Sequence, residues 1–387
     1  MRTAQIYLAN IAGSATGCIL TGFVLMERLT LVGIEAVLVL CGVGCAVVLD
    51  ALLAAPAPGK LGARAAAGVG LGALALISLP RLTPGLLERL MWKQAWPGKP
   101  PFAHVVENRS GIVTADASGA VYGHGMYDGR FNIDPVHDTN GIVRAYALSL
   151  FHPAPRDVLM IGLSSGSWAQ VIANGPDVAS VTIVEINPGC ATLVQRTPAV
   201  ASVLANPKVT VHVDDGRRWL RRNPDRRFDA VVSNTTYHFR ANASSLLSTE
   251  FLEIVRPHLK PGGVFLYNTT GSARVQRTGC ASFPHGARFS NLLVVSTSPL
   301  DVDFERWRRT LRAYRIDGRR VLDPARQEDA RALDGLMGMR ADLEPGAGTR
   351  ADKQIEPCAE ILARTSGKQV VTDDNMGTEW RFVFGLE

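Results

Sequence analysis

Residues 158–166 read VLMIGLSSG, an apolar run that ends in a turn of small residues. About twenty residues later a second apolar run, residues 181–184, leads directly into Glu185. A buried parallel strand that opens into a glycine turn lets a ligand lie against bare backbone. An acidic residue at the end of the next strand is placed to accept hydrogen bonds from a ribose diol. The two segments together predict a site for an adenosine-type cofactor.

Strand-like segments alternate with helical segments along the middle of the chain. The predicted strands are residues 158–162, 181–185, 209–213, 228–233 and 264–268, and the predicted helices are residues 168–173, 190–195, 217–222 and 245–258. Such alternation gives right-handed crossovers and a parallel sheet covered on both faces. We therefore predict a doubly wound, mostly parallel α/β fold of the Rossmann type. Residues 291–296 are expected to add an antiparallel edge, and short runs between residues 103 and 122 a small antiparallel sheet.

Polar residues follow four of these strands. They are the turn Gly162–Gly166, Glu185, the pair Asp214 and Asp215, and Asn234. Ligands of open α/β sheets lie beyond the carboxyl ends of the strands, so these residues are expected to meet at one site. The helix that starts near Ser167 also presents free backbone amides to a ligand. Ordinary loop chemistry at strand ends is the alternative interpretation.

The same motifs resemble the spermidine synthase family of aminopropyltransferases, a branch of the S-adenosylmethionine methyltransferase fold. The likeness spans residues 103–300 and is carried by residues 158–162, 184–186, 215–217, 228–232, 246–251 and 259–263. A membrane region fused to such a domain is similar to the membrane-fused bacterial branch of that family. The resemblance implies a class I methyltransferase-like sheet and a transferase activity.

The resemblance also implies roles for the site residues. Glu185 is expected to hold the ribose hydroxyls, and Asp214 or Asp215 the adenine amino group, with Asp215 the closer match. The turn is expected to lie against the amino-acid part of the cofactor. Its cofactor-binding residues are Gly162, Ser164, Ser165 and Gly166. The implied co-substrate is S-adenosylmethionine or its decarboxylated form, with a polyamine or other amine as acceptor and no metal.

Two carboxylates of the family's site are replaced by neutral groups. Ser165 stands where the family turn carries an aspartate for the aminopropyl ammonium, and Asn234 stands where it carries its catalytic aspartate. The family's Tyr-Gln/His-Glu stretch, which helps form the pocket, falls near residues 140–142, and these lack all three side chains. Each lost carboxylate would stabilise an ammonium by about 1.5–3 kcal/mol. These departures disfavour a polyamine and the decarboxylated co-substrate, and they make intact S-adenosylmethionine more acceptable.

The segment after Asn234 supplies the remaining catalytic candidates. His238 titrates near neutral pH and is a candidate general base, while Tyr237 is placed to orient a nucleophile. Arg240 is either an anion-binding residue or a solvated surface arginine. The loop is alternatively a cap for the helix at Ser245. Candidates to line the pocket from an upstream hairpin are His124, Tyr127 and Asp128.

Three functions remain open at this point. The first is an aminopropyltransferase acting on a polyamine. The second is a transferase that moves an alkyl group from intact S-adenosylmethionine to another nucleophile. The third is a non-catalytic nucleotide-binding module that regulates the membrane region. The crowded loop at residues 234–242 disfavours the third, because a degenerate site has no need of it.

The N-terminal part of the chain is predicted to be membrane-embedded. Residues 4–26, 36–49 and 65–80 contain no charge, and a transmembrane helix needs about 20 apolar residues. About three helices are therefore predicted within residues 1–81, although a cleaved signal peptide is the alternative for the first segment. Gly13 and Gly17 have the spacing of a close helix contact, which is compatible with a tight bundle or a homo-oligomer.

The remaining expectations concern domains, location and partners. The expected parts are a membrane region (1–81), a linker (82–102), a small β domain with a helix (103–152), a cofactor-binding domain (153–300) and a peripheral extension (301–387). The positive-inside bias and a nucleotide-type cofactor predict a bacterial inner-membrane protein whose soluble domain faces the cytoplasm. The net charge of +6 is spread without a basic block, so nucleic-acid binding is not expected. The six cysteines show neither disulfide nor zinc spacing, which fits a reducing compartment.

Overall fold

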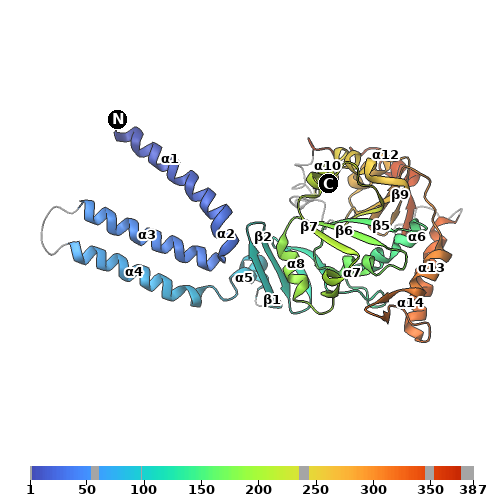
Figure 1. The fold of residues 1–387 in the computed structure, drawn as a ribbon, viewed down its shortest axis with the longest axis horizontal. Coiled ribbons are helices and arrows are strands. Elements are labelled where there is room, and N and C mark those ends of the chain that lie inside the picture. Colours follow the sequence, from blue (N-terminus) through green and yellow to red (C-terminus); the bar gives the residue numbers. More distant parts are fainter. Residues whose placement is uncertain (1, 54–60, 97, 235–243, 345–352, 376–387) are drawn as a thin grey trace. The chain divides into compact units, whose positions relative to one another are not determined.

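The computed structural model describes residues 2–53, 61–96, 98–234, 244–344 and 353–375 (Figure 1). The chain forms two compact units, residues 1–118 and 119–387. The boundary between the units falls inside the segment 103–152 that was expected to form one small domain.

Apolar helices open the first unit. They are α1 (Arg2–Leu20), which continues through a π-helical turn (Thr21–Leu25) into α2 (Met26–Arg28), then α3 (Leu31–Leu53) and α4 (Leu61–Leu82). Within the described residues three spans are long and apolar enough to cross a membrane: Thr3–Arg28, Leu31–Leu52 and Ala65–Leu82. Large apolar side chains on them are exposed, Ile6 by 70% and Leu71 by 69%. A continuous apolar surface of this kind is typical of contact with a membrane or a partner.

Small residues allow two of these helices to pack closely. A Cβ atom at Gly72 of α4 would collide with Val43 of α3, so the glycine is needed for the approach of the two helices. The Gly13 and Gly17 positions of α1 have open space around them instead. The first unit ends with α5 (Leu86–Trp92), a 3₁₀ turn (Lys93–Ala95) and the antiparallel strands β1 (Phe102–Asn108) and β2 (Gly111–Asp116).

The second unit begins with an antiparallel hairpin and a short helix. The elements are β3 (Ala120–Gly123), β4 (Met126–Arg130), the 3₁₀ helix η3 (Ile142–Ala147) and α6 (Leu148–Phe151). The helical pattern expected over residues 142–151 is thus a 3₁₀ helix that continues into one turn of α-helix.

The centre of the second unit is an eight-stranded sheet, counted over the described residues, in the order β14-β10-β11-β9-β8-β5-β6-β7. The strands are β5 (Asp157–Ile161), β6 (Ser180–Glu185), β7 (Val209–Val213), β8 (Phe228–Ser233), β9 (Leu259–Asn268), β10 (His285–Phe289), β11 (Leu292–Ser296) and β14 (Ile355–Pro357). Strands β5 to β9 pair in parallel, and β11, β10 and β14 are antiparallel. The predicted doubly wound sheet is confirmed. The expectation that residues 291–296 form its edge is wrong, because β10 and β14 continue the sheet beyond β11.

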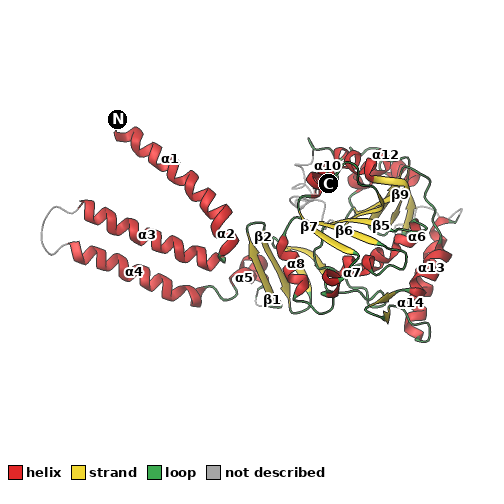
Figure 2. Ribbon diagram, in the orientation of Figure 1, coloured by secondary structure: helices red, strands yellow, loops and turns green. Residues whose placement is uncertain are grey.

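Helices cover both faces of this sheet (Figure 2). They are α7 (Ser167–Ala173), α8 (Pro188–Gln195), α9 (Ser202–Ala205), α10 (Gly216–Arg222), α11 (Thr249–Val255), α12 (Ala273–Ser282), α13 (Phe304–Ala313), α14 (Gln327–Gly338) and α15 (Cys358–Arg364). Shorter elements are the 3₁₀ turns Ser244–Leu246, Arg256–His258 and Met339–Leu343 and the strands β12 (Arg315–Ile316) and β13 (Arg319–Arg320). On one face, Phe251 of α11 packs in a buried apolar cluster with Val231 and Phe265 of the sheet. This burial fixes the strand ends that form the site.

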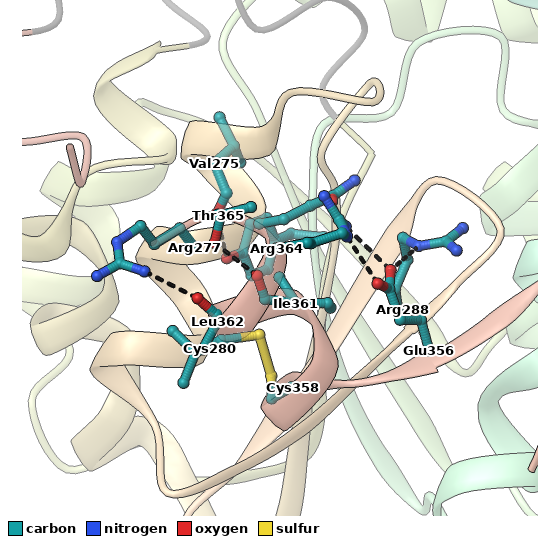
Figure 3. The surroundings of a disulfide bond; sticks show 12 residues. Val275, Arg277, Cys280, Arg288, Glu356, Cys358, Ile361, Leu362, Arg364 and Thr365 are labelled. Carbon is teal, nitrogen blue, oxygen red and sulfur yellow. Dashed lines mark hydrogen bonds and ion pairs between the residues drawn. A yellow bond between two sulfur atoms is a disulfide. The ribbon is translucent and has the colours of Figure 1, made fainter. Parts of the chain in front are cut away.

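The C-terminal tail is more than the peripheral packing expected for it. It supplies β14, and a disulfide bond joins Cys280 of α12 to Cys358 of α15, with the two Cα atoms 5.3 Å apart (Figure 3). The expectation that the cysteines form no disulfide is therefore wrong. The two cysteines are separated by 78 residues, so no local spacing announces the pair. Because disulfides are typical of oxidising compartments, the cysteines no longer support a reducing one.

Candidate functional site

A cleft lies at the carboxyl ends of the parallel strands, within the second unit. It brings together most of the residues predicted for cofactor binding, together with one predicted catalytic residue: Gly162, Ser164, Ser165, Glu185, Asp214, Asp215 and Asn234. Gly166 does not line it. Tyr237 and His238, the other two catalytic candidates, lie outside the described residues. The cleft is where ligands of open α/β sheets bind.

Glu185 ends β6 and holds the turn that follows β5. Its Oε2 accepts hydrogen bonds from the backbone N of Leu163 at 2.6 Å and of Ser164 at 3.3 Å, and its Oε1 accepts from Asn187 N at 2.8 Å. Burial raises the pKa of Glu185, and these backbone hydrogen bonds oppose that rise. Each carboxylate oxygen accepts more than one hydrogen bond, so Oε1 keeps capacity for a ligand hydroxyl.

The two glycines of the turn have different tasks. Gly162 has φ +92°, and a Cβ atom there would meet no protein atom within 4 Å, so it leaves open space in the lining of the cleft. Gly166 has φ +76°, and a Cβ atom there would press against Val194 of α8 at 2.8 Å. Gly162 thus keeps the ligand side of the turn bare, while Gly166 allows the turn to pack on α8.

The adjacent aspartates after β7 also differ. Asp214 accepts from Asp215 N at 2.8 Å and forms ion pairs with Arg218 and Arg222. Asp215 caps α10 by accepting from Arg218 N through Oδ1 at 2.9 Å, and no described group donates a hydrogen bond to its Oδ2. The contacts therefore leave Asp215 the freer acceptor, in keeping with its closer match to the family position.

Amide side chains occupy the ends of β8 and β9. Asn268 donates from Nδ2 to Oδ1 of Asn234 at 3.0 Å, and its own Oδ1 accepts from Thr270 N at 2.8 Å. Neither amide can take up a proton, so this pair can hold a ligand but cannot act as a general base. Within the described part of the chain, no group of three or more His, Cys, Asp or Glu side chains is arranged to hold a metal ion.

The β3–β4 hairpin covers the glycine turn. Ser164 donates from Oγ to the carbonyl of Asp128 at 2.6 Å, and Ser167 donates from Oγ to the carbonyl of Arg130 at 2.7 Å. The expectation that His124, Tyr127 and Asp128 line the pocket is confirmed.

Sequence reasoning did not identify several residues of the cleft. They are Asn140, Arg144, Trp168 and Asn268. Asn268 is the last residue of the predicted strand 264–268, so the rule of polar strand ends applies to it as it does to Asn234. Arg144 is the only charge in the apolar stretch from Ile142 to Phe151, which is an unusual place for an arginine.

Residues 146–278 match the sequence model of the Spermine/spermidine synthase domain. This part of the chain is similar to that domain. The chain also resembles a polyamine aminopropyltransferase of Streptococcus uberis, with 34% identity over 117 residues, and one of Mycobacterium tuberculosis, with 33% identity over 129 residues. The alignments cover 30% and 31% of this chain, and 40% and 25% of those proteins. The chain thus spans less than half the length of these curated relatives.

Two solved structures are similar to about half of this chain at low sequence identity. A spermidine synthase in complex with the transition state analogue AdoDATO aligns over 52% of this chain and 74% of its own, with 16% identity and a TM-score of 0.45. Human methyltransferase-like protein 13 in complex with SAH aligns over 54% of this chain and 93% of its own, with 19% identity and a TM-score of 0.33. The doubly wound fold itself rests on the strand order of the sheet.

Proposed function

We propose that this protein is a membrane-attached, spermidine synthase-like transferase. It binds S-adenosylmethionine or the decarboxylated form and transfers an alkyl group to an amine or another nucleophile. The observation that carries the proposal is that Glu185 and Asp215 line one cleft with the open turn at Gly162. An acidic strand end, a bare turn and a second acidic residue are the groups needed for a ribose, a backbone contact and an adenine amino group.

The reaction requires the protein to position the two substrates and to remove one proton from the acceptor. The nucleophile attacks the carbon bonded to the sulfonium, that carbon–sulfur bond breaks, and a neutral thioether leaves with the electron pair. An amine acceptor then loses a proton to a base. Asn234 is proposed to hold the acceptor, Tyr237 to orient it and His238 to receive the proton.

The first unit is proposed to attach the domain to a membrane. Three apolar spans support this, and the arginines and lysine that follow the third span support a cytoplasmic domain in a bacterial inner membrane. The Cys280–Cys358 disulfide instead favours a domain on the oxidising, periplasmic side of the membrane. The redox state of these two cysteines in cells distinguishes the two orientations. We also propose a homo-oligomer, and the spacing of Gly13 and Gly17 is the support for it.

A non-catalytic nucleotide-binding module is the second candidate. It is favoured by the neutral pair Asn234 and Asn268, because the family carries its catalytic aspartate at the position of Asn234. Under this alternative the adenosine contacts persist without turnover.

The test is binding and turnover by the full chain in detergent micelles, with Glu185→Gln and Glu356→Gln compared. Both glutamates are buried, each about 6% exposed, but Glu356 binds Arg288 and Arg364 outside the cleft. We expect Glu185→Gln to lower affinity for 5′-methylthioadenosine at least about tenfold through loss of a charge-assisted contact, and Glu356→Gln to leave it unchanged. Equal affinities for wild type and Glu185→Gln would refute the site. Binding without alkyl transfer to any amine would favour the regulatory module.

A further inference from the structure

Arg144 places a guanidinium in the wall of the cleft. It belongs to η3 and lies over the ring of Trp168, 5.3 Å from the ring centroid. Nε donates to the carbonyl of Gly141 at 2.8 Å, Nη2 to the carbonyl of Asn140 at 2.9 Å, and Nη1 to Oδ1 of Asn291 at 2.5 Å. All three acceptors are neutral. A guanidinium has five N–H donors, so two remain for another group.

The local backbone makes room for this arginine. Gly141 has φ +66°, and a Cβ atom there would clash with the guanidinium nitrogens. A side chain at position 141 would therefore displace Arg144. The stacking on Trp168 and the hydrogen bonds fix the guanidinium on both sides.

The positive charge of Arg144 has no ion-pair partner among the described residues. Burial lowers its pKa to about 10, so it remains cationic at neutral pH. Asp138 is the carboxylate whose charge acts on it, but Asp138 is exposed and accepts hydrogen bonds from the backbone N of Asn140, Ile142 and Val143. A largely buried charge without a counter-ion is unfavourable, and an anionic ligand group would relieve it.

A buried acceptor lies beside this cation. Oδ1 of Asn140 has no hydrogen-bond donor among the described residues, although Nδ2 of the same side chain donates to the carbonyls of Arg130 and Asn132 at 3.2 Å. Asn140 also lines the cleft. The wall therefore offers unused donors and an unused acceptor on neighbouring residues. An α-amino acid group presents the matching pair, a carboxylate and an ammonium.

The strand order of the sheet places Asn140 and Arg144 away from the proposed adenosine contacts. Glu185 and Asp215 follow β6 and β7 on one side of β5, whereas β8, β9 and β11 lie on the other side. Arg144 is bound to Asn291, whose carbonyl accepts from Thr269 N just after β9. Arg144 therefore faces the half of the cleft opposite the adenosine contacts, and Trp168 connects it to the helix after the glycine turn.

We propose that Arg144 binds the carboxylate, and Asn140 Oδ1 the ammonium, of the amino-acid part of intact S-adenosylmethionine. This inference rests on the proposed function, because it assumes an adenosyl co-substrate in the cleft. It assigns the substrate class as the carboxylate-bearing co-substrate rather than the decarboxylated one. Arg144 is then the residue that sets this specificity.

The test measures binding of three ligands to the full chain in detergent micelles: 5′-methylthioadenosine, S-adenosylmethionine and decarboxylated S-adenosylmethionine. Wild type should bind the intact form at least about tenfold more tightly than the decarboxylated form. Arg144→Met, which keeps an apolar stem over Trp168, should remove that preference and leave binding of 5′-methylthioadenosine unchanged. Arg144→Lys should retain part of the preference because it retains the charge.

Arg306→Met is the matched control, because Arg306 is also a partly buried arginine, and it binds Asp301 and the backbone carbonyls of Ser149 and Leu150 outside the cleft. It should leave the preference intact. A wild-type preference for the decarboxylated form, or none at all, would overturn the inference, and this comparison needs no variant. If Arg144→Met weakened the binding of all three ligands equally, the role of Arg144 would be purely structural. Failure of wild type to bind even 5′-methylthioadenosine would overturn the proposed function and this inference with it.

Discussion

The Cys280–Cys358 disulfide fastens the C-terminal tail to α12, and its removal has a predictable effect. The bond joins α12 to α15, and Figure 3 shows Glu356 between Arg288 and Arg364 beside it. The tail then continues to Asp373, whose carboxylate binds the Arg217 guanidinium at 2.9 and 2.7 Å. Arg217 lies on α10 two residues after Asp215. The disulfide therefore anchors a segment that reaches the edge of the candidate site.

The size of the effect follows from the loop that the bond closes. A sequence separation of 78 residues corresponds to about 4.5 kcal/mol of unfolded-state entropy in the chain-closure treatment. Noncovalent contacts hold the same segment in the folded state, including the β10–β14 pairing and the ion pairs of Glu356. The folded structure should therefore persist without the bond. We expect the free energy of unfolding to fall by about 2–4.5 kcal/mol in Cys280→Ser/Cys358→Ser.

The assay is pulse proteolysis of the purified chain across a urea series, with and without a reducing agent. The midpoint shift multiplied by the urea slope gives the change in unfolding free energy. Reduced wild type should match the double variant. The control Cys18→Ser/Cys41→Ser removes two free, exposed cysteines and should not shift the midpoint. A difference below about 1 kcal/mol between oxidised and reduced wild type would refute the reasoning.

Three further predictions concern the site and its location. Because the pKa of Glu185 is raised above 4.5 mainly by burial, affinity for 5′-methylthioadenosine should fall with acidification already above pH 4.5; a flat profile down to pH 4.5 would contradict this. For the unliganded protein the sign is opposite, since ionising this carboxyl opposes folding and protonation relieves that cost. Asn234→Asp should raise alkyl transfer to a diamine, measured against wild type, and no gain would mean that the pocket has diverged beyond this position. If the domain faces the cytoplasm, acid-quenched thiol trapping in growing cells should find Cys280 and Cys358 reduced, and an oxidised pair would reverse the proposed orientation.

The sheet could be predicted from the sequence because its signals are local. Each parallel strand is a short apolar run that ends in a polar or small residue, and two of them, Val209–Val213 and Phe228–Ser233, have the predicted bounds. The carboxyl ends of parallel strands meet at one edge of the sheet, so the sequence could also predict that Glu185 and Asp215 line one cleft. These predictions needed only periodicity and the fixed geometry of parallel strands.

The features that were missed depend on contacts between distant segments. Strand β14 has three residues and little apolar pattern of its own, so its pairing with β10 decides its conformation. The disulfide joins residues that share no motif. The task of Gly166 depends on Val194, which packs against the turn from another helix. No local pattern encodes such contacts, and only the folded chain reveals them.

Arg144 lies apart from the residues that hold the glycine turn, so its proposed role is separate from theirs. The proposed adenosine contacts come from β6 and β7, and the other half of the cleft comes from β8, β9 and Arg144, which is bound to Asn291. Because β5 separates the two groups, we expect substitutions in that other half of the cleft to leave the hydrogen bonds of Glu185 to the turn untouched. Neutral Asn234 and cationic Arg144 both lower the negative charge on that side, and both therefore favour a carboxylate over an additional ammonium. Two independent positions thus favour the same ligand charge.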